Sequence, residues 1–146
     1  MKINDTINYL MEFRKNTKSV KNQKYSEKFI RLLNEIEIKV VDPNQIKRID
    51  TELKLLVENF EIEKDNIQVK KELKKFIQFL RSELKITIPY YYTQIGALVG
   101  LIATIFFGFL SLFIGLIAGA AIGFFFDERA KKEGRKLNTE LNEFLC

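Results

Sequence analysis

The chain has 146 residues and a formal net charge of +5, from 24 Lys and Arg against 19 Asp and Glu. It contains no histidine and one cysteine, Cys146, which excludes both a Cys/His metal site and an intrachain disulfide. No Asp, Glu, Lys or Arg occurs between Lys85 and Asp127. The chain is long enough for one small domain, and this uncharged gap predicts a second element of different chemistry.

Residues 1–88 show the apolar spacing of amphipathic helices, with steps of three and four that place side chains on one helix face. The apolar positions are Ile3, Ile7, Leu10, Met11, Tyr25, Phe29, Leu32, Leu33, Ile36, Val40, Ile46, Ile49, Leu53, Leu56, Phe60, Val69, Leu73, Phe76, Leu80 and Leu84. Asp42-Pro43 marks a helix start, because Asp is a preferred N-cap and Pro a preferred first residue. We predict a basic cytosolic helical domain here, a bundle of three or four helices.

The next segment, Ile95 to Phe126, has 32 residues, and its only polar side chains are Thr104 and Ser111. As one helix it would be roughly 48 Å long, whereas the hydrocarbon core of a bilayer is about 30 Å thick. We therefore expect an all-α membrane protein in which this segment crosses the bilayer twice. The predicted boundaries are 89–126 for the transmembrane helical hairpin, with passes at 89–107 and 110–126, and 127–146 for a short amphipathic cytosolic tail.

Small residues recur every four positions in each half of this segment. The two series are Gly96, Gly100, Thr104 and Gly108, then Ser111, Gly115, Gly119 and Gly123. Such a stripe, a glycine zipper, lets another helix backbone approach closely, although glycine is also simply common in transmembrane helices. We predict that these residues serve helix packing or oligomerisation, either between the two passes or between subunits of a homo-oligomer.

Both flanks of the segment are basic, and aromatic residues stand at its ends. The residues predicted to meet a membrane surface are Lys70, Lys71, Lys74, Lys75, Arg81, Lys85, Tyr90, Tyr91, Tyr92, Arg129, Lys131, Lys132, Arg135 and Lys136. By the positive-inside rule, both termini would be cytoplasmic at the inner (cytoplasmic) membrane. The expected partner is a lipid bilayer with anionic headgroups, although the charges could also be a topology signal alone. Nucleic acid is not expected, because no aromatic residues interleave with the basic ones.

The stretch from Gly115 to Ala130, GLIAGAAIGFFFDERA, resembles the end of the hydrophobic hairpin in colicin-type pore-forming domains. Those hairpins are likewise rich in Gly, Ala and Ile, uncharged, and followed at once by acidic residues that open an amphipathic helix. The resemblance covers about the last 55 residues and implies a pore-forming activity. The 88 residues before the hairpin are fewer than the helical shell of that family, which favours permanent residence in the membrane.

No catalytic constellation is present, so we predict neither an enzyme nor a cofactor or metal. Acidic pairs such as Glu35/Glu37 and Glu61/Glu63 are two residues apart and point in different directions on a helix. Our first hypothesis is an oligomeric membrane-perturbing or pore-forming effector, of toxin or phage-defence type, controlled by the helical domain. The alternative is a non-pore membrane anchor or adaptor that recruits a cytosolic protein through the bundle.

Overall fold

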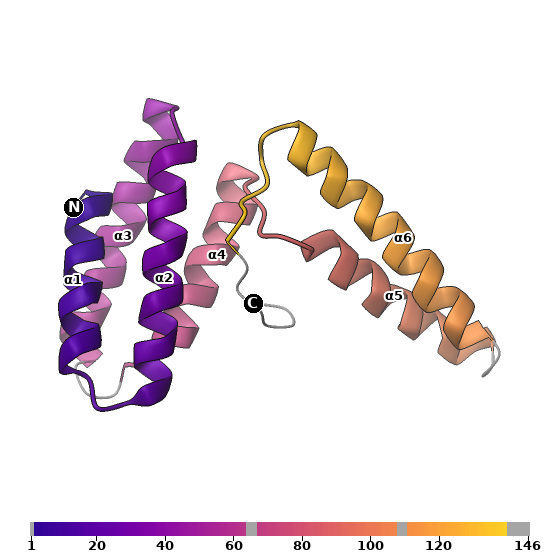
Figure 1. Ribbon diagram of the computed structural model, residues 1–146, viewed down its shortest axis with the longest axis horizontal. Coiled ribbons are helices and arrows are strands. Elements are labelled where there is room, and N and C mark those ends of the chain that lie inside the picture. Colours follow the sequence, from indigo (N-terminus) through magenta and orange to yellow (C-terminus); the bar gives the residue numbers. More distant parts are fainter. Residues whose placement is uncertain (1, 64–66, 108–110, 140–146) are drawn as a thin grey trace. The chain divides into compact units, whose positions relative to one another are not determined.

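The computed structural model describes residues 2–63, 67–107 and 111–139, without the side chains of 103–107, 111 and 112 (Figure 1). Within these ranges the structure has six helices, joined by loops, and one isolated backbone pairing between Thr87 and Lys136. It forms two compact units, Met1–Leu84 and Lys85–Cys146.

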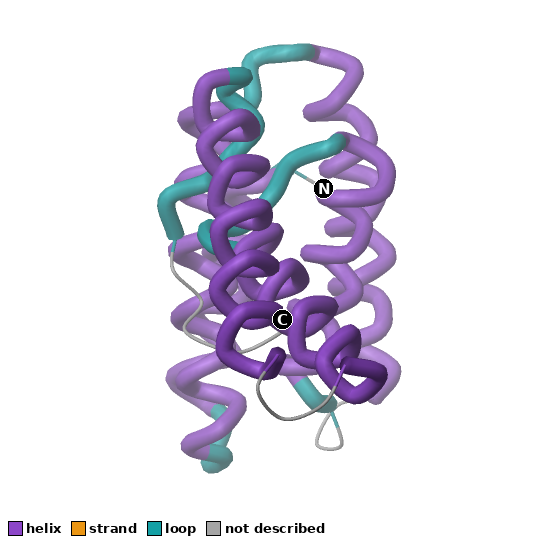
Figure 2. The backbone as a smooth tube through the Cα atoms, turned by 90° about the vertical axis from the view of Figure 1, so that its right-hand side faces the viewer, coloured by secondary structure: helices purple, strands orange, loops and turns teal. Residues whose placement is uncertain are grey.

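The first unit is a bundle of four helices joined by short loops (Figure 2). The helices are α1 (Ile3–Asn16), α2 (Val20–Lys39), α3 (Pro43–Glu63) and α4 (Val69–Leu84). Their starts follow from the local sequence. The Ser19 hydroxyl accepts a hydrogen bond from the Asn22 amide at 3.3 Å, and the Asp42 carboxylate accepts one from the Asn44 amide at 3.0 Å. Both side chains satisfy amides that the first helical turn leaves without a partner.

The helices of this unit do not pack in chain order. α1 packs against α2 and α3, and α4 packs against the same two helices. Consequently α2 and α3, although consecutive in the sequence, occupy opposite corners of the bundle.

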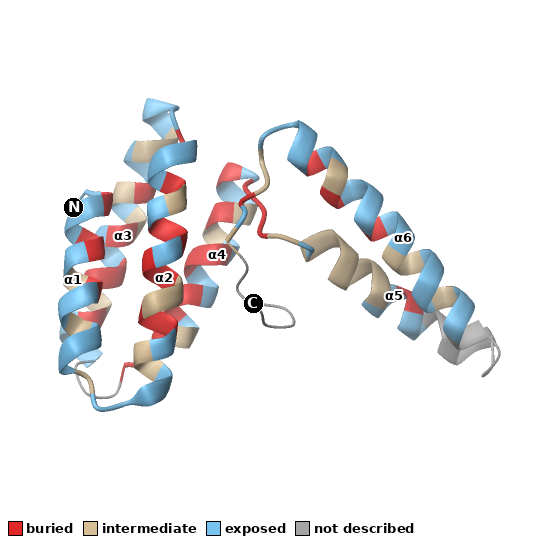
Figure 3. Ribbon diagram, viewed as in Figure 1, coloured by how far each residue is buried: buried red, intermediate tan, exposed pale blue. Residues whose placement is uncertain are grey.

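The apolar faces of these helices meet in a common core, visible as the buried stripes in Figure 3. The largest fully buried side chains of the unit are Leu10, Phe29, Leu32, Leu33, Ile36, Ile49, Leu53, Phe60, Leu73, Phe76 and Leu80. All of them belong to the helical pattern in the sequence. Two residues of that pattern are not fully buried: Ile46 is half-buried, and Met11 is 44% exposed. Across the core, the rings of Phe29 and Phe76 have their centroids 5.2 Å apart.

The second unit is a helical hairpin of α5 (Tyr91–Phe107) and α6 (Ser111–Lys132). The two helices run antiparallel in close contact (Figure 1). α6 does not stop at the end of the apolar stretch but continues through Asp127 to Lys132. Beyond it, the Thr87 amide donates to the Arg135 carbonyl and the Leu137 amide donates to the Thr87 carbonyl, both at 2.8 Å.

The prediction of a membrane-spanning hairpin is wrong. In the part of the chain that the structure describes, no helix is both long and apolar enough to cross a membrane. α5 has 17 residues, or roughly 26 Å. The apolar part of α6 ends at Phe126, before Asp127, Glu128 and Arg129 bring three charges into the same helix.

Several expectations are corrected with that prediction. The fold class is all-α, but the all-α membrane class is not supported, nor are two transmembrane passes, a pore or a location in the inner membrane. The expected separate tail at 127–146 also differs from the structure, because Asp127 to Lys132 belong to α6.

Replacing Phe29 by Ala should destabilise the first unit by about 3–5 kcal/mol, because it removes a fully buried ring and leaves a cavity against Phe76. Chemical denaturation followed by far-UV circular dichroism measures the change. The matched control is Ile38→Ala, since Ile38 is 80% exposed and its loss should change stability by less than about 0.5 kcal/mol. Equal effects of the two substitutions would contradict this core.

Candidate functional site: the α5–α6 hairpin

The two helices of the hairpin touch through the backbones of their glycines. A Cβ atom added to Gly96 would lie 2.0 Å from the carbonyl oxygen of Gly119, and one added to Gly100 would lie 2.0 Å from that of Gly115. A Cβ atom on Gly123 would lie 2.2 Å from the carbonyl oxygen of Tyr92. No side chain larger than hydrogen fits at this spacing, so the two glycine stripes pack on each other within one chain.

For three members of the two small-residue series, the structure does not describe a contact between the helices. Gly108 lies outside the described residues. Thr104 and Ser111 are in helical backbone, but their side chains also fall outside the description. The contact therefore rests on Gly96 and Gly100 of α5 and on the three glycines of α6.

A buried carboxylate holds the start of α5. Asp127, on α6, is fully buried. Its Oδ2 accepts hydrogen bonds from the Thr93 amide at 2.9 Å and the Thr93 hydroxyl at 2.6 Å, and its Oδ1 accepts one from the Tyr92 amide at 3.3 Å. These amides belong to the first turn of α5, where the helix dipole favours a negative charge.

Asp127 thus serves as the cap that the sequence before α5 lacks. Tyr90, which precedes the helix, adopts a left-handed φ of 59° and offers no acceptor of the usual capping kind. No motif in the sequence marks Asp127 as a capping residue. The only signal was its position as the first charged residue after the apolar stretch, because a cap supplied from another helix leaves no local pattern.

The outer faces of the hairpin are apolar and exposed. Glycines occupy the helix contact, and many of the large side chains are exposed; Figure 3 colours most of α6 and parts of α5 as exposed. We call this set the apolar hairpin surface; its members are Leu98, Val99, Leu101, Ile102, Phe113, Ile114, Leu116, Ile117, Ile122, Phe124, Phe125 and Phe126. Large exposed apolar surfaces are typical of protein or membrane interaction sites.

Aromatic and basic residues gather at the end of the hairpin where α5 begins. The ring centroids of Tyr92 and Phe126 are 6.0 Å apart, and those of Tyr91 and Tyr92 are 5.2 Å apart. The Lys136 ammonium lies 5.0 Å from the centre of the Tyr90 ring. Tyr92 therefore lies beside Phe126, the last apolar residue before the charges of α6, and Tyr91 lies next to Tyr92.

Charges at this end are partly paired. Glu133 accepts hydrogen bonds from Arg129, at 3.0 Å, and from Arg135. These hydrogen bonds lower the pKa of Glu133, and the bond to Glu133 raises the pKa of Arg135. Over the whole second unit, Lys85–Cys146, the sequence has six Lys and Arg against five Asp and Glu, so its charges are nearly balanced.

The other predicted surface residues belong to the first unit. Lys70, Lys71, Lys74, Lys75 and Arg81 lie on α4. The Lys75 ammonium donates to Glu72 at 2.7 Å, and this hydrogen bond raises the pKa of Lys75. The Lys70 ammonium lies 5.4 Å from the centre of the Tyr25 ring. The basic residues that the sequence groups together are thus divided between the two units.

Among the described residues, no group of three or more Asp, Glu or Cys side chains could hold a metal ion. Comparison with protein-family models, curated proteins and solved structures gives no match to this chain. The likeness to the colicin-type hairpin therefore stays a sequence-based interpretation.

Replacing Gly119 by Ala should loosen the hairpin, because the added Cβ would lie 2.1 Å from the Gly96 carbonyl oxygen. In an isolated helix the same change would raise helix stability by about 1 kcal/mol. In the hairpin we expect it to lower the stability instead. Hydrogen exchange of the α5 and α6 amides should be faster in this variant. Ala118→Leu, at an exposed position of α6, is the control and should leave exchange unchanged; protection retained in both variants would rule out the glycine contact.

Replacing Asp127 by Ala should free the amides of Tyr92 and Thr93. The loss of hydrogen bonds to a buried carboxylate costs about 1–3 kcal/mol, which corresponds to roughly 5- to 150-fold faster exchange of these two amides. Asp127→Asn should give an intermediate effect, because the amide keeps one acceptor oxygen. Glu128→Gln is the neighbouring control. Unchanged exchange in Asp127→Ala would show that this carboxylate does not cap α5.

Proposed function

We propose that the protein is a lipid-surface adaptor. Its hairpin binds an anionic lipid surface without crossing it, and its four-helix unit recruits a protein partner. The observation that carries this proposal is the apolar hairpin surface, which is uncharged throughout and ends beside tyrosines and basic residues such as Arg129 and Lys136.

Each part of the hairpin matches one property of a lipid–water interface. Burial of a Phe or Ile side chain contributes about 1.5–3 kcal/mol, so a few members of the apolar hairpin surface would be sufficient to hold the protein there. Tyrosine prefers the lipid–water interface because its ring is apolar and its hydroxyl is hydrated. Each Lys or Arg near an anionic surface adds about 1 kcal/mol.

The four-helix unit carries its own exposed apolar residues. Leu55 is 52% exposed and Ile62 is 78% exposed. They lie seven residues apart on α3, which places them two turns apart on the same side of the helix. Such a pair is a suitable anchor for an amphipathic helix of a protein partner.

A homo-oligomer is the second candidate, and the same apolar surface supports it. The glycine stripes already pack within the chain, so copies would meet through the outer faces, where Ile114 and Ile117 are 71% and 66% exposed. An effector activity controlled by the four-helix unit would then require this assembly.

Flotation of the purified chain with vesicles tests the lipid proposal. The native chain should float with vesicles that contain anionic lipid, bind neutral vesicles less, and lose part of its binding at high salt, because salt screens the basic residues. Phe125→Glu should weaken binding roughly tenfold or more, since it removes a ring that would be buried in the lipid and places a negative charge at the surface. Phe125 is 68% exposed, so the fold should tolerate the change.

The matched control is Ile38→Glu, the same type of change at an 80% exposed position of the other unit. It should float like the native chain. If the native chain does not float, or if both variants float equally well, the lipid proposal fails. A chain that stays in solution as an oligomer, and becomes monomeric with Phe125→Glu in light scattering, would instead support the second candidate.

A further inference from the structure

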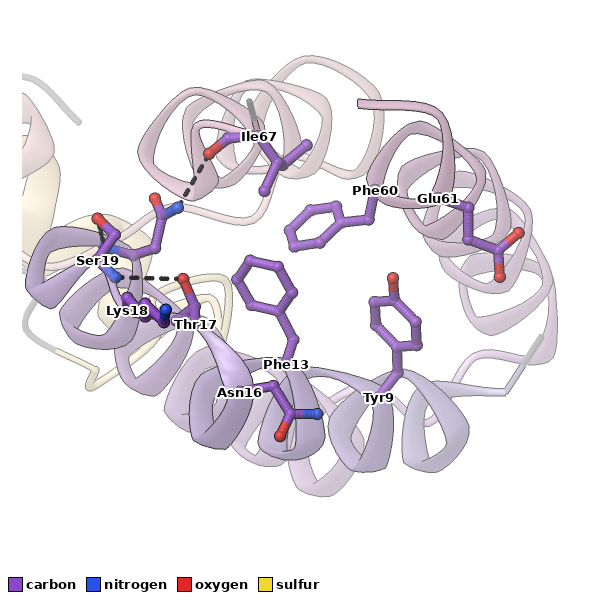
Figure 4. A pocket seen from close by; sticks show the side chains of 10 residues that line it. Tyr9, Phe13, Asn16, Thr17, Lys18, Ser19, Phe60, Glu61 and Ile67 are labelled. Carbon is purple, nitrogen blue, oxygen red and sulfur yellow. Dashed lines mark hydrogen bonds between the residues drawn. The ribbon is translucent and has the colours of Figure 1, made fainter. Parts of the chain in front are cut away.

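α2 and α4 of the first unit lie side by side and run in the same direction. Near their starts, the Asn22 side chain of α2 donates to the Ile67 carbonyl at 3.0 Å (Figure 4) and accepts from the Val69 amide at 3.4 Å. Seven residues further along each helix, the ring centroids of Phe29 and Phe76 are 5.2 Å apart. Both helices therefore begin at the same end of the bundle, where their dipoles are positive.

Lysines follow each of these two helices on one side, because steps of three and four residues return to the same face of a helix. The two rows meet at Tyr25. The ammonium groups of Lys28, on α2, and Lys70, on α4, lie 5.3 Å and 5.4 Å from the centre of its ring. We call this set the lysine face; its members are Lys21, Lys24 and Lys28 of α2 and Lys70 and Lys74 of α4.

The carboxylates of α2 and α4 are engaged outside the lysine face. The two helices carry ten Lys and Arg against five Glu. Three of the five interact with neighbouring helices: Glu27 with Arg14, Glu37 with Asn4, and Glu83 with Arg48. The other two pair within their own helices: Glu35 with Lys39 and Glu72 with Lys75. The side formed by α2 and α4 therefore has a clear excess of positive charge.

The other two helices give the opposite side of the bundle an acidic character. α1 packs against α3 as α2 packs against α4, so the two pairs form opposite sides of the unit. α1 and α3 carry five Lys and Arg against seven Asp and Glu. The first unit is thus polarised, and a negatively charged surface would attract it with the α2–α4 side foremost.

The composition of the lysine face favours an anionic lipid surface over other polyanions. Its central ring, Tyr25, is only 5% exposed and cannot stack on the bases of a single-stranded nucleic acid. All its charged members are lysines, whereas arginine is the preferred residue for bidentate recognition of phosphate in nucleic acids. Lysine is also depleted at protein–protein interfaces. A cluster of lysines on one side of amphipathic helices is typical of binding to anionic headgroups.

We propose that the lysine face is a second lipid contact, through which the four-helix unit itself lies against an anionic lipid surface. This inference rests on the proposed function for the kind of surface, but on different residues from those of the hairpin. It also orients the unit. The α1–α3 side would face the water, and α3 would hold Leu55 and Ile62 accessible to a protein partner.

Vesicle flotation with a pair of double variants tests the lysine face. Lys24→Gln combined with Lys74→Gln should weaken binding to phosphatidylserine-containing vesicles by roughly ten- to thirtyfold, since each lysine contributes about fivefold. The difference from the native chain should shrink at high salt. The matched control, Lys15→Gln combined with Lys47→Gln, removes the same charge from α1 and α3 and should bind as the native chain does. All four side chains are exposed, so both folds should be retained.

The orientation has a separate readout, because the chain contains no tryptophan. Gln78→Trp places a fluorophore four residues after Lys74, on the same side of α4. Thr51→Trp places one four residues before Leu55, on the same side of α3. Both positions are exposed. Energy transfer to a dansyl-labelled lipid in the vesicles should be stronger from Gln78→Trp than from Thr51→Trp.

Equal loss of binding in the two double variants would overturn the proposal, because net charge alone would then account for the attraction. Equal energy transfer from the two tryptophan positions would overturn it as well. A short DNA duplex that removes the native chain from the vesicles, but not the Lys24→Gln, Lys74→Gln variant, would reassign the face to nucleic acid.

Phe125→Glu separates this inference from the proposed function of the hairpin. Binding lost in Phe125→Glu but kept in the Lys24→Gln, Lys74→Gln variant would overturn the lysine face and leave the hairpin proposal standing. The reverse result would support the lysine face and contradict the hairpin proposal.

Discussion

The direct backbone contact between α5 and α6 governs the second unit. With Gly96 and Gly100 against the carbonyl oxygens of Gly119 and Gly115, the helices approach until no Cβ fits between them. The large side chains are consequently excluded from the contact and lie on the outer faces. The same approach brings Asp127 of α6 within hydrogen-bonding distance of the first turn of α5. Both the apolar surface and the buried cap therefore follow from the absence of side chains at the glycines.

The two units are stabilised in different ways, and this difference suits an adaptor. The four-helix unit buries the apolar faces of its helices in a core of Leu, Ile and Phe, as a water-exposed bundle does. The hairpin relies on backbone contact and on one carboxylate, so its apolar side chains remain available for a lipid surface. In the proposed function, recruitment and surface binding would belong to separate parts of one chain.

The error about membrane crossing has a specific cause. The prediction of two passes rested on the length of the apolar stretch, on its two small-residue series and on its basic flanks. α6 takes in the charges of Asp127, Glu128 and Arg129, and among the described residues neither α5 nor α6 is both long and apolar enough to cross a membrane. Apolar continuity in a sequence therefore does not establish the length of an apolar helix.

By itself, the sequence determined the helical periodicity of the first unit, because apolar steps of three and four leave few alternatives to an amphipathic helix. It also determined where small residues recur, and that charge is absent between Lys85 and Asp127. Only the tertiary structure decided that α2 and α3 sit at opposite corners, that the glycine stripes face each other, and that Asp127 caps a helix 34 residues earlier in the chain. Each of these depends on which helix faces which, and contacts between distant residues leave no periodic signal in a single sequence.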